Sequence, residues 1–172
     1  VVDYLVEQKG FKHYSARAIF EEEIARQGLE SNRDNMRLVA NQLRAEFGLD
    51  YLVTHYLKKM QAEGISNAAI DSIRALAEAK TLKQHGGILL AVDANRELRY
   101  QRIIARKSSS DQISYEKFVE QEELEMNDPD PNGMQKAKVM AASDYTIVNE
   151  GDLEELHQKI DEVLNQITNE GN

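Results

Sequence analysis

Short apolar runs alternate with longer amphipathic stretches along this chain. The apolar runs predict strands at Phe11 to Tyr14, Asn67 to Asp71, Ile88 to Asp93 and Asp144 to Val148. Apolar residues at helical spacing predict helices at Val1 to Gln8, Ser15 to Gln27, Asn32 to Phe47, Tyr51 to Ala62, Ala75 to Gln84, Arg96 to Lys107 and Leu153 to Ile167. Because strands that alternate with helices pair in parallel through right-handed crossovers, the pattern predicts a three-layer α/β sheet.

Length and charge narrow the class of protein. A chain of 172 residues fits a single domain spanning residues 1–172. No apolar stretch approaches the roughly 20 residues of a membrane helix, and no secretion signal opens the chain, which favours a cytoplasmic location without a membrane partner. The net charge of −9 opposes binding to nucleic acid polymers, although clustered arginines can still hold one small anion. Without cysteine, the chain has no disulfide or thiolate metal site.

Charged residues follow two of the predicted strands. Asp71 and Arg74 stand at the end of the second strand, and the helix after the third strand carries Arg102 and Arg106 four residues apart. Ligands bind beyond the carboxyl ends of parallel strands, and carboxylates with arginines suit magnesium and phosphates. The pattern therefore indicates a phosphoryl-transfer site.

Five segments, in order, resemble one family of enzymes. They are F-K-H-Y-S at 11–15, S-N-R-D-N at 31–35 with A-N-Q-L-R at 40–44, I-D-S-I-R at 70–74, A-V-D-A at 91–94 with Arg102 and Arg106, and A-S-D-Y-T-I-V-N-E-G at 142–151. Together they resemble the nucleoside monophosphate kinase group of P-loop enzymes, closest to its dephospho-CoA kinase-like and archaeal adenylate-kinase-related members. The resemblance implies a kinase that uses ATP and Mg²⁺, with a parallel sheet of order 2-3-1-4-5, a helical acceptor-binding arm at about 31–64 and a helical lid at about 107–133.

The phosphate-binding part of that family is not found in these residues. No G-x-x-x-x-G-K-[ST] loop occurs, and the chain begins inside what resembles the helix that follows this loop. We therefore expect the central strand and the loop, roughly 10 to 20 residues, to precede Val1. A true start at Val1 would instead favour a noncatalytic nucleotide-binding or interaction module derived from this kinase fold.

The resemblance also implies roles for single residues. Asp71 would place the metal or the acceptor hydroxyl, and Arg102 and Arg106 would contact ATP phosphates. Asn149, Glu150 and Gly151 would approach the adenine through backbone atoms. The residues implied for the phosphate acceptor are Ser15, Arg17, Arg33, Arg37 and Arg74, with Arg44 a weaker candidate.

Each of these residues also has a structural explanation. Asp71 could cap a helix beginning at Ser72, and Ser15 could simply cap the helix that follows it. The arginines could be solvated or could pair with nearby acids, and residues 149–151 could be an ordinary strand-to-helix turn. The sequence does not distinguish a nucleoside monophosphate, a deoxynucleotide or dephospho-CoA as acceptor.

The lid region departs from better-known kinases because glutamates dominate it. A mobile, solvated helix with a hinge at Ser108 to Ser110 is the simplest interpretation. The run D-P-D-P-N-G at 128–133 imitates a calcium loop, but Val139 stands where the loop needs a bidentate carboxylate. The histidines His13, His55, His85 and His157 are too isolated to form a local metal site.

Overall fold

The chain folds into a mixed α/β protein, and the computed structural model describes residues 1–106 and 113–170. The predicted hinge at Ser108 to Ser110 and the end of the predicted helix at Lys107 lie outside the described residues. The strands are β1 (Lys12–Tyr14), β2 (Ala68–Ile70), β3 (Leu90–Asp93) and β4 (Tyr145–Val148). The helices are α1 (Val2–Lys9), α2 (Ala16–Arg26), α3 (Arg33–Phe47), α4 (Tyr51–Glu63), α5 (Leu76–Gln84), α6 (Arg96–Ala105), α7 (Tyr115–Met126), α8 (Lys136–Ala141) and α9 (Leu153–Glu170).

The strands pair in parallel, as predicted, but those described form two separate sheets. In the first sheet β1 pairs with β2, and Lys12 lies opposite Ala68. In the second sheet β3 pairs with β4, and Leu90 lies opposite Tyr145. The inner edges of β2 and β3 therefore pair with no strand in the described part of the chain. The mixed α/β class is confirmed, with small parallel sheets and many helices.

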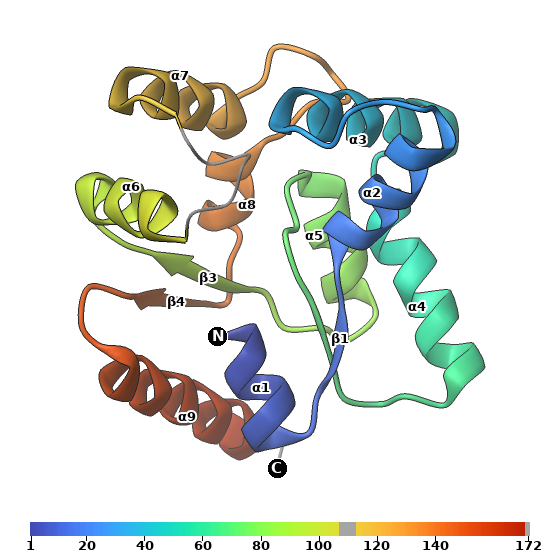
Figure 1. The fold of residues 1–172 in the computed structure, drawn as a ribbon. Helices are drawn as coiled ribbons and strands as arrows, with labels where there is room; N and C mark the ends of the chain where they lie inside the picture. The colour runs from blue at the N-terminus through green and yellow to red at the C-terminus, as the bar shows by residue number, and fades with distance from the viewer. Residues whose placement is uncertain (107–112, 171–172) are drawn as a thin grey trace.

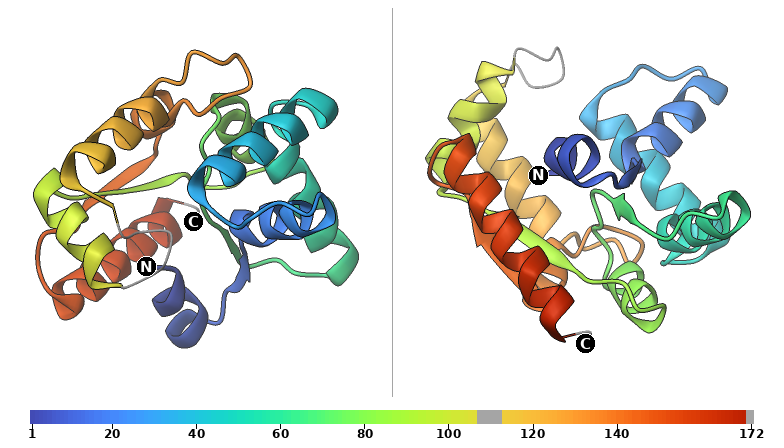
Figure 2. Two further views of the ribbon diagram at one scale, coloured as in Figure 1. Left: turned by 45° about the horizontal axis from the view of Figure 1, so that its top comes forward. Right: turned by 90° about the horizontal axis from the view of Figure 1, so that it is seen from below.

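Helices surround each sheet separately (Figure 1). The β3–β4 sheet lies between α6 and α9, whereas α2, α3, α4 and α5 gather around β1 and β2. Helix α1 lies between the two groups, which both views of Figure 2 show. Leu5 of α1 packs with Ile147 of β4 and with Leu156 and Ile160 of α9. This apolar cluster joins the start of the chain to its last helix.

A second apolar cluster connects the two halves further along. Val53 of α4 and Ala79 of α5 pack with Leu89 and Val139. Leu89 directly precedes β3, and Val139 lies in α8. The helical arm has a core of its own, made by Ile24, Val39 and Leu43. Several predicted helix ends are explained by local chemistry: the Asn32 side chain accepts a hydrogen bond from the Asn35 amide at the start of α3.

The lid region differs from a freely solvated helix. Phe118 and Glu122 of α7 are buried, and α8, which the sequence pattern did not predict, packs against α5 and α7. Within the described residues no helix is long and apolar enough to cross a membrane.

Candidate functional site

Asp71 organises the end of the first sheet. Its Oδ1 accepts a hydrogen bond from the Ala16 amide at 2.9 Å, and its Oδ2 lies 3.0 Å from Nε2 of His13. The Ser15 hydroxyl reaches the same Oδ2 at 3.5 Å. Ser15 makes no side-chain capping bond at its own helix, so Asp71 caps α2 from the neighbouring strand. Asp71 and Ser15 are thus brought together.

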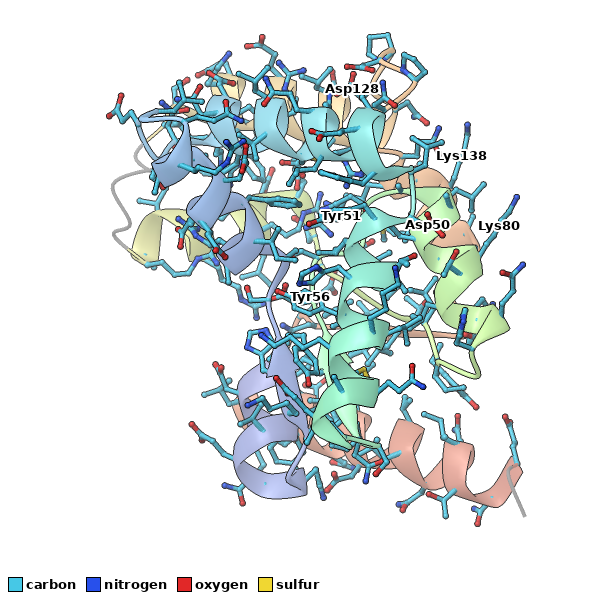
Figure 3. All side chains as sticks on the ribbon, turned by 90° about the vertical axis from the view of Figure 1, so that its right-hand side faces the viewer. Asp50, Tyr51, Tyr56, Lys80, Asp128 and Lys138 are labelled. Carbon is cyan, nitrogen blue, oxygen red and sulfur yellow. The ribbon has the colours of Figure 1, made fainter. Side chains whose placement is uncertain are left out.

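The backbone next to Asp71 is strained. Ser72 has φ of 58°, the one positive value among the described non-glycine residues. Such a conformation costs about 1 to 3 kcal/mol and is concentrated at functional sites. On the other side of Asp71, Tyr56 of α4 (labelled in Figure 3) donates a hydrogen bond to the Ser15 carbonyl at 2.6 Å. The turn that carries Ser15 is therefore fixed from two directions.

A groove of about 600 Å³ opens between the two sheets. Residues from β2 to Arg74 line one side, and residues from Gly86 to Val92 line the other. Asp71, Ser72 and Arg74 all contribute to the lining, as does Lys136 of α8. Asp71 and Arg74 therefore share one groove at the carboxyl end of β2, where the sequence analysis placed them.

Arginines of α6 line a second hollow of about 600 Å³, beside the carboxyl ends of β3 and β4. Arg99, Arg102 and Arg106 contribute to it, together with Asp93 and Asn149. Arg102 donates to the carbonyls of Asn149 at 2.7 Å and Gly151 at 3.1 Å. The structure thus joins Arg102 to the loop at residues 149–151, and Arg102 fixes the shape of that loop.

Arg99, which lies within one turn of Arg102, is held by two carboxylates. Its guanidinium binds both carboxylate oxygens of Glu122 at 2.7 Å and Asp93 at 2.8 Å. The hydrogen bonds to Glu122 raise the pKa of Arg99. Glu150 accepts from the Asn95 amide at 3.1 Å, which closes the loop against the start of α6.

The basic residues of the arm face the acidic lid. Arg33 donates to Gln121 at 3.1 Å and lies 3.9 Å from Glu125, and Arg37 lies 3.5 Å from Asp128. Farther along α3, Arg44 is buried and donates to Glu78 of α5 at 3.1 Å. Helix α3 is therefore held along its length by polar and acidic side chains of the lid region and of α5.

Three predicted acceptor residues, Arg17, Arg33 and Arg37, are not among the residues that line the groove with Asp71 and Arg74. Arg17 pairs with Glu21 on its own helix, at 2.7 Å, and both side chains are exposed. Among residues 1–106 and 113–170, no three histidine or acidic residues gather closely enough to hold a metal ion by themselves. Mg²⁺ commonly binds through one or two carboxylates, with phosphates and water as its other ligands. A single carboxylate such as that of Asp71 is therefore compatible with Mg²⁺ chemistry.

Sequence reasoning missed Lys136 and Glu78, and it identified Glu122 only as one of the glutamates that dominate the lid. Lys136 opens a helix of six residues that carries no periodic signal, and the two glutamates lie within ordinary amphipathic helices. Their importance comes from burial beside an arginine or a groove. Only the three-dimensional packing of α3, α5, α6 and α7 reveals that burial.

The arrangement defines a mixed α/β protein with an acid and arginines at the carboxyl ends of parallel strands. No family model matches the chain. It is similar to a UPF0200 protein of Pyrobaculum aerophilum, 30% identical over 163 residues, which cover 93% of this chain and 86% of that protein. The chain therefore belongs to the UPF0200 family.

Two other relatives show how the similarity extends. A UPF0200 protein of Hyperthermus butylicus is 27% identical over 172 residues, covering 99% of this chain and 89% of that protein. A UPF0200/UPF0201 protein of Archaeoglobus fulgidus is 31% identical over 153 residues, which cover 85% of this chain but 45% of that longer protein. These names carry no activity.

Proposed function

We propose that this protein is an ATP-dependent phosphotransferase that acts on a small acceptor such as a nucleoside monophosphate or dephospho-CoA. The observation that carries the proposal is the shared groove of Asp71 and Arg74 at the end of β2. A carboxylate that can place Mg²⁺ and a guanidinium that can grip a phosphate are the two groups that phosphoryl transfer requires there. The arginine-lined hollow beside β3 and β4 supplies a place for a second phosphate compound.

The proposed fold is a P-loop-type three-layer sheet of order 2-3-1-4-5. Here β1, β2, β3 and β4 would be strands 2, 3, 4 and 5 of that order. The separation of the strands into two parallel pairs supports this arrangement, because one more parallel strand would join the unpaired edges of β2 and β3.

Catalysis would rest on alignment and charge neutralisation. Mg²⁺ bound to ATP would neutralise charge on the transferring phosphoryl group. Asp71 would orient that ion or the acceptor hydroxyl, and Arg74 would hold the acceptor phosphate. Arg106 and Arg99 line the hollow for ATP, while Arg102 fixes the loop at 149–151 for the adenine. Because ATP is the proposed cosubstrate, we also place the protein in the cytoplasm.

The test is ATP consumption by the protein as its gene encodes it, with its intact mass verified, in the presence of Mg²⁺ and each candidate acceptor. We expect turnover with one acceptor and a loss of kcat/KM of about a hundredfold in Arg74→Ala. Lys80→Ala is the matched control, because Lys80 is an exposed cation on α5 at the outer surface (Figure 3).

Two results would contradict the proposal. One is the absence of turnover with all acceptors together with no ATP-dependent rise in Tm, which would favour a noncatalytic module of the same fold. The other is turnover that neither Arg74→Ala nor Lys80→Ala changes. That result would mean that Arg74 and its groove are not part of the active site.

A further inference from the structure

Lys136 is held beside Arg74 by the backbone. The Gln135 amide donates a hydrogen bond to the Arg74 carbonyl at 2.7 Å, which ties the start of α8 to the segment that leaves β2. Both side chains line the groove between the sheets, and both are partly buried. Two cations from distant parts of the sequence thus meet at the same wall of one groove.

Neither cation is neutralised by an ion pair within the described residues. The side chain of Arg74 donates only to the carbonyl of Ile73, at 3.3 Å, and Lys136 has no hydrogen bond or ion pair there. Burial and the neighbouring Arg74 lower the pKa of Lys136. Adjacent like charges repel, so this arrangement is unfavourable until an anion joins them.

The acids near Lys136 are engaged elsewhere. Glu122 binds Arg99 through both oxygens and lies 3.5 Å from Arg96, whereas Glu125 lies 3.9 Å from Arg33. These carboxylates still favour the charged form of Lys136, and Arg99 opposes it. The charge that is left without a direct partner is therefore positive, and it faces the groove.

The hydrogen-bond donors of Arg74 and Lys136 suit a compact anion. A guanidinium offers a flat pair of donors, and an ammonium offers a point charge that reaches a remaining oxygen. The strained backbone of Ser72 lies between Asp71 and Arg74, at the same wall. A phosphate group has the charge and the number of oxygens to satisfy both cations.

We propose that Lys136 and Arg74 together bind the phosphate group of a phosphomonoester substrate. This inference rests on the proposed function, since it assigns the acceptor phosphate to a particular pair of side chains. It makes Lys136 a substrate-binding residue and the acceptor a compound that already carries a phosphate before the reaction.

The first experiment measures binding of adenosine 5′-monophosphate and of inorganic phosphate by titration calorimetry, with adenosine as the phosphate-free comparison. We expect adenosine 5′-monophosphate to bind and Lys136→Met to weaken it at least about tenfold, while Lys136→Arg retains most of the affinity. Lys138→Met is the matched control, because Lys138 is exposed on the same helix and lies at the outer surface (Figure 3). Binding of inorganic phosphate alone with the same dependence would also support the site.

A second readout separates binding from folding. The pKa of Lys136, followed by NMR of its side chain, should rise when adenosine 5′-monophosphate is added, and it should not rise with adenosine. The charged groups that act on Lys136 are Arg74, Arg99, Glu122 and Glu125. Because Arg74 lowers the pKa of Lys136, Arg74→Met should raise the pKa of Lys136 in the ligand-free protein.

Equal affinity in wild type, Lys136→Met and Arg74→Met would overturn the inference, and so would an unchanged pKa of Lys136 at saturating ligand. Failure of the proposed function looks different. If adenosine 5′-monophosphate binds in a way that depends on Lys136, but ATP is not consumed with any acceptor, the proposed phosphotransferase activity is wrong and the phosphate-binding site stands. If ATP is consumed and Lys136→Met leaves that turnover unchanged, the phosphotransferase activity stands and the role of Lys136 in phosphate binding is wrong.

Discussion

Tyr14 shows what burial does to a single titratable side chain. It lies at the end of β1 with 3% of its surface exposed, and its ring packs against Tyr56 at 5.0 Å between centroids. Its hydroxyl donates to Glu63 at 2.7 Å. Burial, and then the hydrogen bond to Glu63, raise the pKa of Tyr14 from 10.0 to about 12. The folded protein therefore resists ionisation of this phenol.

That shift predicts a pH dependence of stability. The contribution of neutral Tyr14 is complete below pH 10, where the phenol is neutral in both states, and it is lost as the pH rises towards about 12. In Tyr14→Phe this alkaline loss should be smaller, because phenylalanine does not ionise. Urea unfolding midpoints across the alkaline range measure the effect, with Tyr115→Phe at an exposed position as control. Identical alkaline slopes in wild type and Tyr14→Phe would refute the assignment.

Single residues also mark the limit of sequence reasoning. Asp71 and Arg74 line one groove because both follow the same strand. The helix that Asp71 caps was not identified, because its partner is the Ala16 amide of a different strand-helix unit. Arg102 was assigned to phosphates, and its bonds to the carbonyls of residues 149–151 depend on how β4 ends beside α6.

At the scale of elements, a buried ion pair connects α3 to α5. Arg44 and Glu78 have 3% and 0% of their side chains exposed. Glu78 also accepts hydrogen bonds from the amides of Arg74 and Ala75, each at 2.9 Å. The same carboxylate therefore starts α5, holds the arm and fixes the backbone of Arg74.

Removing this carboxylate should be costly. Glu78→Ala leaves Arg44 buried without its partner and two amides unsatisfied, so we expect a loss of about 3 to 5 kcal/mol in the free energy of unfolding. Urea unfolding measures it, and Glu21→Ala, which breaks the exposed pair with Arg17, should change nothing measurable. Adding Arg44→Leu to Glu78→Ala should recover part of the loss; a further loss equal to that of the single change would contradict the ion-pair explanation.

Element boundaries were predicted well where capping chemistry marks them. Asn32 starts α3, and Gly10 and Gly64 end α1 and α4 with φ of 71° and 66°, where a side chain would be strained. Helix α8 was missed because it has six residues and its N-cap residue, Gln135, makes no side-chain capping bond. Propensity carries little information over so short a stretch.

At the scale of the whole molecule, the lid and the arm join the two halves through charge. The pairs of Arg33 with Glu125 and Arg37 with Asp128 cross between them, and the Asn41 side chain donates to Asp130 at 2.9 Å. Apolar packing, by contrast, holds α9 on β4. The two kinds of junction should respond differently to salt.

We expect 1 M NaCl to loosen the lid, because the Debye length falls to about 3 Å and weakens partly exposed pairs. Hydrogen exchange in residues 115–126 should accelerate, whereas exchange in α9 around Leu156 and Ile160 should not. Arg37→Ala should reproduce part of the acceleration at low salt. Equal acceleration in both regions would indicate general loosening and would contradict a charge-held lid.

The carboxylate of Asp71 connects three elements: β2, which it follows, β1 and α2. Each carboxylate oxygen already has a hydrogen-bond partner: the Ala16 amide on Oδ1 and the His13 ring on Oδ2. A ligand that draws on Asp71 competes with the first turn of α2 or with β1. A ligand bound at Asp71 would therefore be expected to loosen the first turn of α2, the helix that precedes the arm.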